Sequence, residues 1–161
     1  MVTGLGWRHP RRLFTMLVVV AVAAACGSET AESTHSSPTP QVFGTATLSE
    51  TGCAFAMPDN LPLREVKFTL VNKTAYAGRF ILGYIHDGHT FKDLIDYWNG
   101  PSGQGGEPDF TSEIRFVDVR TSGSGEMVAT IVVAGTYAFH CGYFDPAIGK
   151  VRGFWHELKA G

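Results

Sequence analysis

The sequence is short of charge, and the charge that it has does not cluster. Charged residues make up 17% of the 161-residue chain, and no basic run occurs after Arg12. Proteins that bind nucleic acid need grouped lysines and arginines to neutralise phosphates, so we expect no nucleic-acid partner. Three basic residues and no acidic ones precede Cys26, so the rest of the chain is more acidic than the formal net charge of −2 indicates.

Sequence motifs of catalysis are missing as well. The chain has no serine nucleophile elbow, no obvious carboxylate dyad and no Cys–His pair that we expect to hold a free thiol. The glycine-rich stretch at residues 101–109 lacks the Gly-Lys-Ser/Thr of a phosphate-binding loop. We therefore expect a protein that is not an enzyme.

Residues 1–25 have the pattern of a secretory signal. Residues 1–12 are polar and basic, and residues 13–25 are apolar apart from Thr15. This order is typical of export signals, and the apolar part is shorter than the roughly 20 residues that a membrane-spanning helix needs. The Arg-Arg pair directly before Leu13 also fits a twin-arginine signal, so both export routes stay open.

The cysteine that follows this segment indicates a lipid anchor. Cys26 comes directly after three alanines, and this junction resembles the lipobox of bacterial lipoproteins. The resemblance implies a lipid on the sulfur of Cys26, with palmitate as a candidate acyl chain. We therefore expect an exported protein that is anchored to the outer face of the cell membrane. The alternative is simple cleavage of the signal, with Cys26 as a bystander.

Two segments of different composition follow the signal. Residues 26–41 are dominated by Ser, Thr, Pro and Glu and contain almost nothing apolar, which predicts a flexible linker. Residues 42–161 contain short runs of β-branched and aromatic residues separated by Gly, Pro, Asn and Asp. Six to eight strands of this kind predict one all-β domain, a β-sandwich. The clearest runs are residues 65–72, 80–85, 114–119, 127–133, 137–141 and 151–158.

One segment of the domain follows a helical period instead. Residues 90–98 carry apolar side chains at positions 91, 94, 95 and 98, which is the stripe of an amphipathic helix. Thr90 and Asp93 have the spacing of a capping box, and the Asn-Gly-Pro at residues 99–101 ends the pattern. The sequence therefore predicts one short helix.

The C-terminal part of the chain resembles the cupredoxins. Residues 135–141, Gly-Thr-Tyr-Ala-Phe-His-Cys, resemble the Gly-x-Tyr-x-Phe-x-Cys pattern of the family's last strand, and Gly52-Cys53 resembles its opening. Residues 146–150, Pro-Ala-Ile-Gly-Lys, are similar to an element of periplasmic iron-uptake proteins. Residues 88–94, Gly-His-Thr-Phe-Lys-Asp-Leu, resemble the helix start of small bacterial lipoproteins. The resemblance implies a Greek-key β-sandwich over residues 42–161.

The ligands of a blue-copper site are incomplete in this sequence. Such a site uses two His, one Cys and a weak axial ligand, usually Met. The resemblance makes Cys141 the thiolate, but the next histidine is His156 and no methionine follows Met127. We therefore expect no blue-copper cofactor. An electron-transfer copper protein remains as an alternative.

The number of cysteines favours a disulfide between Cys53 and Cys141. With Cys26 lipidated, Cys53 and Cys141 remain as an even number in an oxidising compartment. The resemblance to iron-uptake domains also implies a bond between these two positions. A disulfide would exclude a copper thiolate, because one sulfur cannot serve both.

The turn His86-Asp87-Gly88-His89 is a second candidate metal site. Imidazole and carboxylate groups suit copper and other divalent metals, and His140 could join His86 and His89 as a ligand. Strand alternation places His140 opposite the face of Cys141. If Cys141 points inward, we expect His140 at solvent or at an edge. The alternative is an exposed turn with solvated histidines.

Three functions are consistent with these features. The first is a cell-envelope lipoprotein whose β-sandwich is a binding module, with an envelope protein or small ligand as its partner. The second is a metal-binding lipoprotein that handles copper or iron through His86, His89 and His140. The third is the electron-transfer copper protein. The incomplete copper ligands and the expected disulfide favour the first.

Overall fold

The computed structural model of the chain describes residues 41–100 and 106–161. The expected signal at residues 1–25, Cys26, the linker up to residue 40 and part of the glycine-rich loop lie outside the described residues. Within the described ranges, no helix has the length and apolar character needed to cross a membrane.

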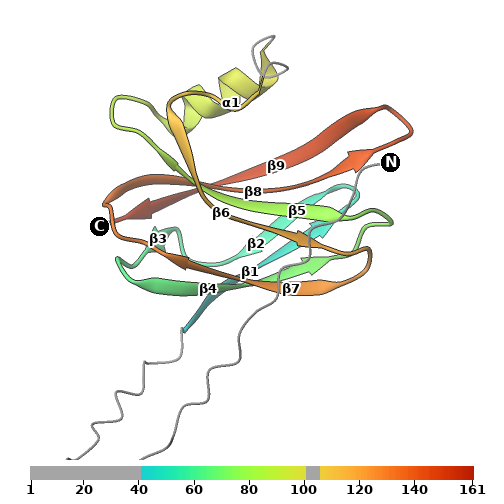
Figure 1. Cartoon of the computed structure of the whole chain (residues 1–161), viewed down its shortest axis with the longest axis horizontal. Coiled ribbons are helices and arrows are strands. Elements are labelled where there is room, and N and C mark those ends of the chain that lie inside the picture. Colours follow the sequence, from blue (N-terminus) through green and yellow to red (C-terminus); the bar gives the residue numbers. More distant parts are fainter. Residues whose placement is uncertain (1–40, 101–105) are drawn as a thin grey trace, which may run out of the picture. The chain divides into compact units, whose positions relative to one another are not determined.

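Two β-sheets pack face to face and form the domain (Figure 1). The strand order is β2-β1-β4-β7 in the four-stranded sheet and β3-β9-β8-β5-β6 in the five-stranded sheet. The strands are β1 (Val42–Ser49), β2 (Gly52–Ala56), β3 (Asn60–Leu61), β4 (Glu65–Asn72), β5 (Gly78–Ile85), β6 (Thr111–Val119), β7 (Ser124–Thr130), β8 (Gly135–Asp145) and β9 (Lys150–Ala160). The predicted all-β sandwich with one short helix is confirmed. β1, β2 and the two-residue β3 were not among the clearest runs, because they are short or rich in small residues.

Alternation along the strands builds the core between the sheets. In β4, Val66, Phe68 and Leu70 are buried and face the opposite sheet, as the sequence pattern predicts. Most of β8 departs from this pattern, because its residues from Tyr137 to Tyr143 are buried on both faces. The outer face of the five-stranded sheet is therefore partly covered as well.

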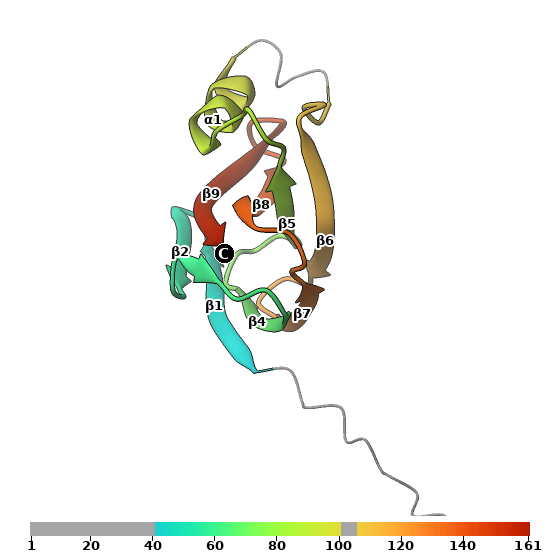
Figure 2. The same ribbon diagram turned by 90° about the vertical axis from the view of Figure 1, so that its left-hand side faces the viewer.

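The helix α1 (Phe91–Asn99) supplies part of that cover. Thr90 begins it with the predicted capping box, in which the Thr90 Oγ1 accepts from the Asp93 N–H at 3.2 Å and the Asp93 carboxylate accepts from the Thr90 N–H at 2.7 Å. The hydrogen bonds from Thr90 lower the pKa of Asp93. Leu94 packs against Ile85 of β5 and Ala138 of β8. Figure 2 shows α1 beyond the five-stranded sheet, on the side away from the four-stranded sheet.

A buried asparagine joins two turns at one end of the sandwich. Asn72 is 1% exposed, and its Nδ2 donates to the carbonyl oxygens of Tyr76, Val119 and Arg120 at 2.7, 3.1 and 3.1 Å. Its Oδ1 accepts from the N–H and the hydroxyl of Thr74 at 3.0 and 2.9 Å. The amide is thus saturated with partners and holds the chain before β5 against the turn after β6.

Replacing Asn72 by alanine should lower the free energy of unfolding by about 2 kcal/mol, because three carbonyls lose an amide donor and the buried Thr74 N–H loses its acceptor. Urea denaturation followed by circular dichroism measures this. The exposed neighbour Lys73 provides a matched control, and Lys73→Ala should change stability by less than roughly 0.5 kcal/mol. Equal midpoints for the two variants would show that the Asn72 network contributes nothing.

Candidate functional site

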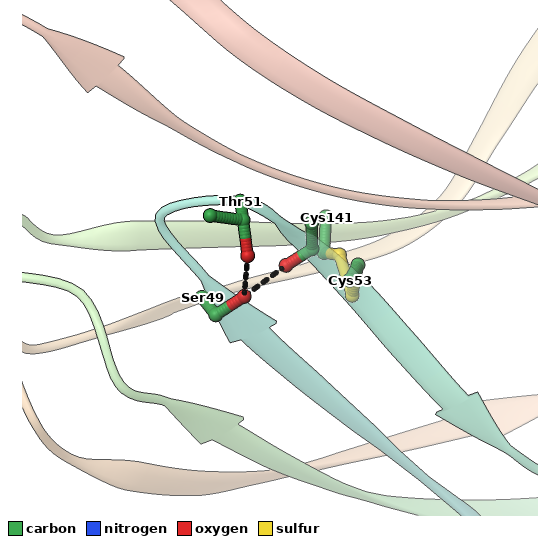
Figure 3. The surroundings of a disulfide bond; sticks show 5 residues. Ser49, Thr51, Cys53 and Cys141 are labelled. Atoms are coloured by element: carbon green, nitrogen blue, oxygen red, sulfur yellow. Dashed lines mark hydrogen bonds between the residues drawn. A yellow bond between two sulfur atoms is a disulfide. The ribbon is translucent and has the colours of Figure 1, made fainter.

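Cys53 and Cys141 join the two sheets through a disulfide (Figure 3). Cys53 lies on β2 at the edge of the four-stranded sheet, and Cys141 lies on β8 inside the five-stranded sheet, with the Cα atoms 6.5 Å apart. Cys141 is fully buried. The sulfur that a blue-copper ion would need is therefore bonded to another sulfur, and the residues present do not fit a blue-copper centre.

Of the two histidines that could complete a copper site, His86 lies far from Cys141 and His156 lies on the neighbouring strand. Cys141 pairs with Phe80 on β5, and His86 follows the end of that strand. At about 3.3 Å per residue, this separates them by roughly 20 Å along the sheet. His156 lies on β9, where its ring stacks on Phe55 of β2 with the centroids 4.8 Å apart. Its register partner on β8 is Phe139, two residues from Cys141 on the same face, so His156 lies nearer to the disulfide than His86 does.

The two histidines of the turn after β5 each contact a different side chain. His86 Nε2 lies 2.7 Å from the hydroxyl of Ser112. The ring of His89 stacks on Phe110, with the centroids 4.3 Å apart. Across residues 41–100 and 106–161, no three His, Cys, Asp or Glu side chains form a group that could hold a metal ion.

His140 lies on the outer face of the five-stranded sheet but not at solvent. Alternation places it opposite the face of Cys141, as predicted, yet it is only 8% exposed. The expectation of a solvent or edge position is therefore wrong. Trp155, its register partner on β9, covers the imidazole with the ring centroids 4.3 Å apart.

His140 lies apart from the two histidines of the turn after β5. It pairs with Ile81 on β5, which places it roughly 16 Å along the sheet from His86. Nδ1 of His140 is buried with no hydrogen-bond partner among the described residues. Burial lowers the pKa of His140 from 6.5 to about 4, so the ring is neutral at physiological pH.

Two glycines make room for the imidazole. Gly142 on β8 and Gly153 on β9 are register partners. A Cβ on Gly153 would lie 2.5 Å from His140 Nε2, and a Cβ on Gly142 would lie 2.9 Å from its Cε1. The ring therefore lies over both glycines. This pair was not predicted from the sequence. Gly142 lies just beyond the predicted run of residues 137–141, in the part of β8 that the prediction left out, and Gly153 lies in the following strand.

A groove of about 1410 Å³ extends along this outer face. Its lining comes from β5, β6, β8, β9 and α1, and includes Ile81, Ile95, Trp98, His140, Phe144 and Trp155. Trp98 of α1 stacks on Trp155 with the centroids 5.9 Å apart. At the other end of β8, Phe144 and Val151 are register partners and are 56% and 66% exposed. The groove is thus mainly apolar and continues onto an exposed apolar surface.

Two carboxylates near the groove are held in ion pairs. Asp118 accepts hydrogen bonds from Arg79 at 2.7 and 2.9 Å, and this bonding lowers the pKa of Asp118. Asp145 accepts from Arg152 at 2.8 Å, and this hydrogen bond lowers the pKa of Asp145. Both groups are ionised at neutral pH and serve as partners for arginine.

The two sheets and the one short helix form the β-sandwich that the sequence predicted, with Cys141 in the long β8 strand. No family model and no curated protein matches the sequence. Solved structures of similar fold include a dithionite-reduced auracyanin from Roseiflexus castenholzii, at 15% identity and TM-score 0.44, covering 73% of this chain and 94% of that one. Auracyanin A from Chloroflexus aurantiacus, a "blue" copper protein, has 16% identity and TM-score 0.45, covering 73% and 96%. A multicopper oxidase has 11% identity and TM-score 0.40, covering 73% and 42%. These similarities assign neither ligand nor activity to this chain.

Proposed function

We propose that this chain is an exported, lipid-anchored protein whose β-sandwich is a non-catalytic binding module without a copper centre. The observation that carries the binding role is the groove beside α1. Ligand sites in proteins are concave and mainly apolar, with a few polar groups that orient the ligand, and the groove has this character. The Cys53–Cys141 disulfide supports the absence of a copper thiolate.

The oxidation state of the two domain cysteines tests the copper part of the proposal. We expect Cys53 and Cys141 of the exported chain to resist alkylation until they are reduced, and no metal to co-purify. Intact mass before and after reduction, together with plasma mass spectrometry for metals, measures both. About one copper per chain with a visible thiolate-to-copper absorption would instead establish an electron-transfer protein. A divalent metal lost in His86→Ala and His89→Ala variants would establish metal handling.

The anchor rests on the sequence around Cys26 and has its own test. In cells fed an alkyne-tagged palmitate, the wild-type chain should acquire the label and the Cys26→Ser variant should not. Ser28→Ala, changed two residues away, serves as the matched control and should be labelled like the wild type. Labelling of the Cys26→Ser variant, or none in the wild type, would contradict lipidation at this cysteine.

A further inference from the structure

We propose that the outer-face groove binds a neutral, largely apolar small molecule whose hydrogen-bond acceptor is bound by the Nε2–H of His140. This inference rests on the proposed binding function and names the ligand class and the group that recognises it.

The position of His140 leaves one ring nitrogen for a ligand. Nδ1 is buried and has no partner among the described residues, whereas Nε2 lies over Gly153 on the face that lines the groove. Because a buried N–H without an acceptor is rarer than an unsatisfied acceptor, we assign the proton of the neutral ring to Nε2. His140 thus presents a donor, and its low pKa keeps it uncharged.

Trp98 adds an aromatic wall to the groove. It lines the groove from α1, and its ring stacks on Trp155 with the centroids 5.9 Å apart. Its own Nε1 is buried and is not open to a ligand in the groove. Recognition of the acceptor is therefore assigned to Nε2 of His140.

The charges around the groove favour a neutral acceptor over an anion. Arg79 is paired with Asp118, and Arg152 is paired with Asp145. The charged side chains that line the groove are Arg79, Lys150, Glu107, Glu113 and Asp118, two cationic and three anionic, so the lining has no net attraction for an anion. A ketone, quinone or ether oxygen needs only a neutral donor, which His140 supplies.

The apolar part of the ligand is expected to follow the exposed apolar surface. Phe144, Ile148 and Val151 are each more than half exposed at the β8–β9 end of this face. Exposed apolar patches of this kind mark binding surfaces. A ring or chain extending from His140 along the sheet would cover them.

Three probes with one ring system separate these contributions. They are 2-acetylnaphthalene, which has a neutral acceptor, 2-ethylnaphthalene, which has none, and 2-naphthoate, which is charged. The protein is the mature chain, residues 26–161, exported with Cys26→Ser so that the disulfide forms without the lipid. Its two tryptophans, Trp98 and Trp155, both line the groove. Their indole N–H signals in a ¹H–¹⁵N spectrum therefore report binding directly.

We expect the ketone to bind at least roughly five-fold more tightly than the hydrocarbon, because it gains one hydrogen bond to His140. The naphthoate should bind no better than the hydrocarbon. His140→Phe keeps a flat ring over the two glycines but removes the donor, so the preference for the ketone should fall to about one-fold. His89→Phe, a histidine that does not line the groove, is the matched control and should keep the wild-type preference.

Several results would overturn the assignment. They are equal affinity for the ketone and the hydrocarbon in the wild type, an undiminished preference in His140→Phe, or unshifted indole signals with every probe. Because the first of these uses the wild type alone, the test stands even if His140→Phe fails to fold. Loss of probe binding in a copper-free, disulfide-bonded chain refutes only this groove assignment. A copper thiolate found by the separate mass and metal measurement refutes the proposed function itself.

Discussion

Replacing both Cys53 and Cys141 by alanine should lower the free energy of unfolding by about 4 to 5 kcal/mol. The disulfide closes a loop with a sequence separation of 88 residues, and a crosslink of this length removes much conformational freedom from the unfolded chain. The loss is comparable to the whole stability of a small domain, about 5 to 15 kcal/mol. Urea denaturation of the oxidised wild type and the double variant measures the difference.

Two controls separate the bond from other effects of the substitutions. Reducing the wild type should reproduce most of the loss, because reduction keeps both side chains in the core. Cys26→Ser, which lies outside the loop, should leave the unfolding midpoint unchanged. A double variant as stable as the oxidised wild type would mean that the bond does not constrain the unfolded chain.

Lowering the pH from 6.5 to 4 should reduce the free energy of unfolding by about 3 kcal/mol through the protonation of His140 alone. Its pKa falls from 6.5 to about 4 on folding, because burial disfavours the charged ring. Between these pH values the unfolded chain binds a proton that the folded chain does not. The stabilisation is therefore complete above pH 6.5, falls as the pH is lowered, and stops falling near pH 4. Unfolding free energies in urea between pH 8 and pH 4 measure the slope.

His140→Phe removes the titrating group and keeps a flat ring at this position, so its stability should change much less over the same range. The carboxylates of Asp93, Asp118 and Asp145 have lowered pKa values and contribute to acid denaturation below their ordinary value of 3.8. Their window lies below that of His140. A wild type and a His140→Phe variant with parallel profiles between pH 6.5 and 4 would contradict the burial of a neutral imidazole.

Local patterns in the sequence were sufficient for the sandwich and the helix. The alternation of apolar and polar residues along β4 predicts which of them face the opposite sheet. The capping box involves Thr90 and Asp93, which are three residues apart. Both are short-range properties, so the chain alone reveals them. The short β3 pairs with β9, which lies almost 100 residues away in the sequence, and no local pattern predicts this pairing.

The site was less accessible to sequence reasoning, because it depends on what covers a face. Alternation placed His140 on the correct side of β8 but could not show that Trp155 lies over it. Alternation also could not show that His86 lies roughly 16 Å along the sheet from His140, because that distance depends on the register between β5 and β8. The tryptophan stack joins α1 to β9 across the fold, and only the tertiary arrangement brings Trp98 to Trp155.

The covalent link between the sheets also sets how far this protein can be stretched. If the chain is pulled from its two ends, the force passes from β2 to β8 through the sulfur atoms and bypasses every strand between them. Only the residues before Cys53 and after Cys141 can then contribute contour length. At roughly 3.5 Å per residue, the oxidised domain gains on the order of 100 Å, and the reduced domain gains several times more. The disulfide therefore limits how far the domain can be extended, because the residues between Cys53 and Cys141 carry no tension.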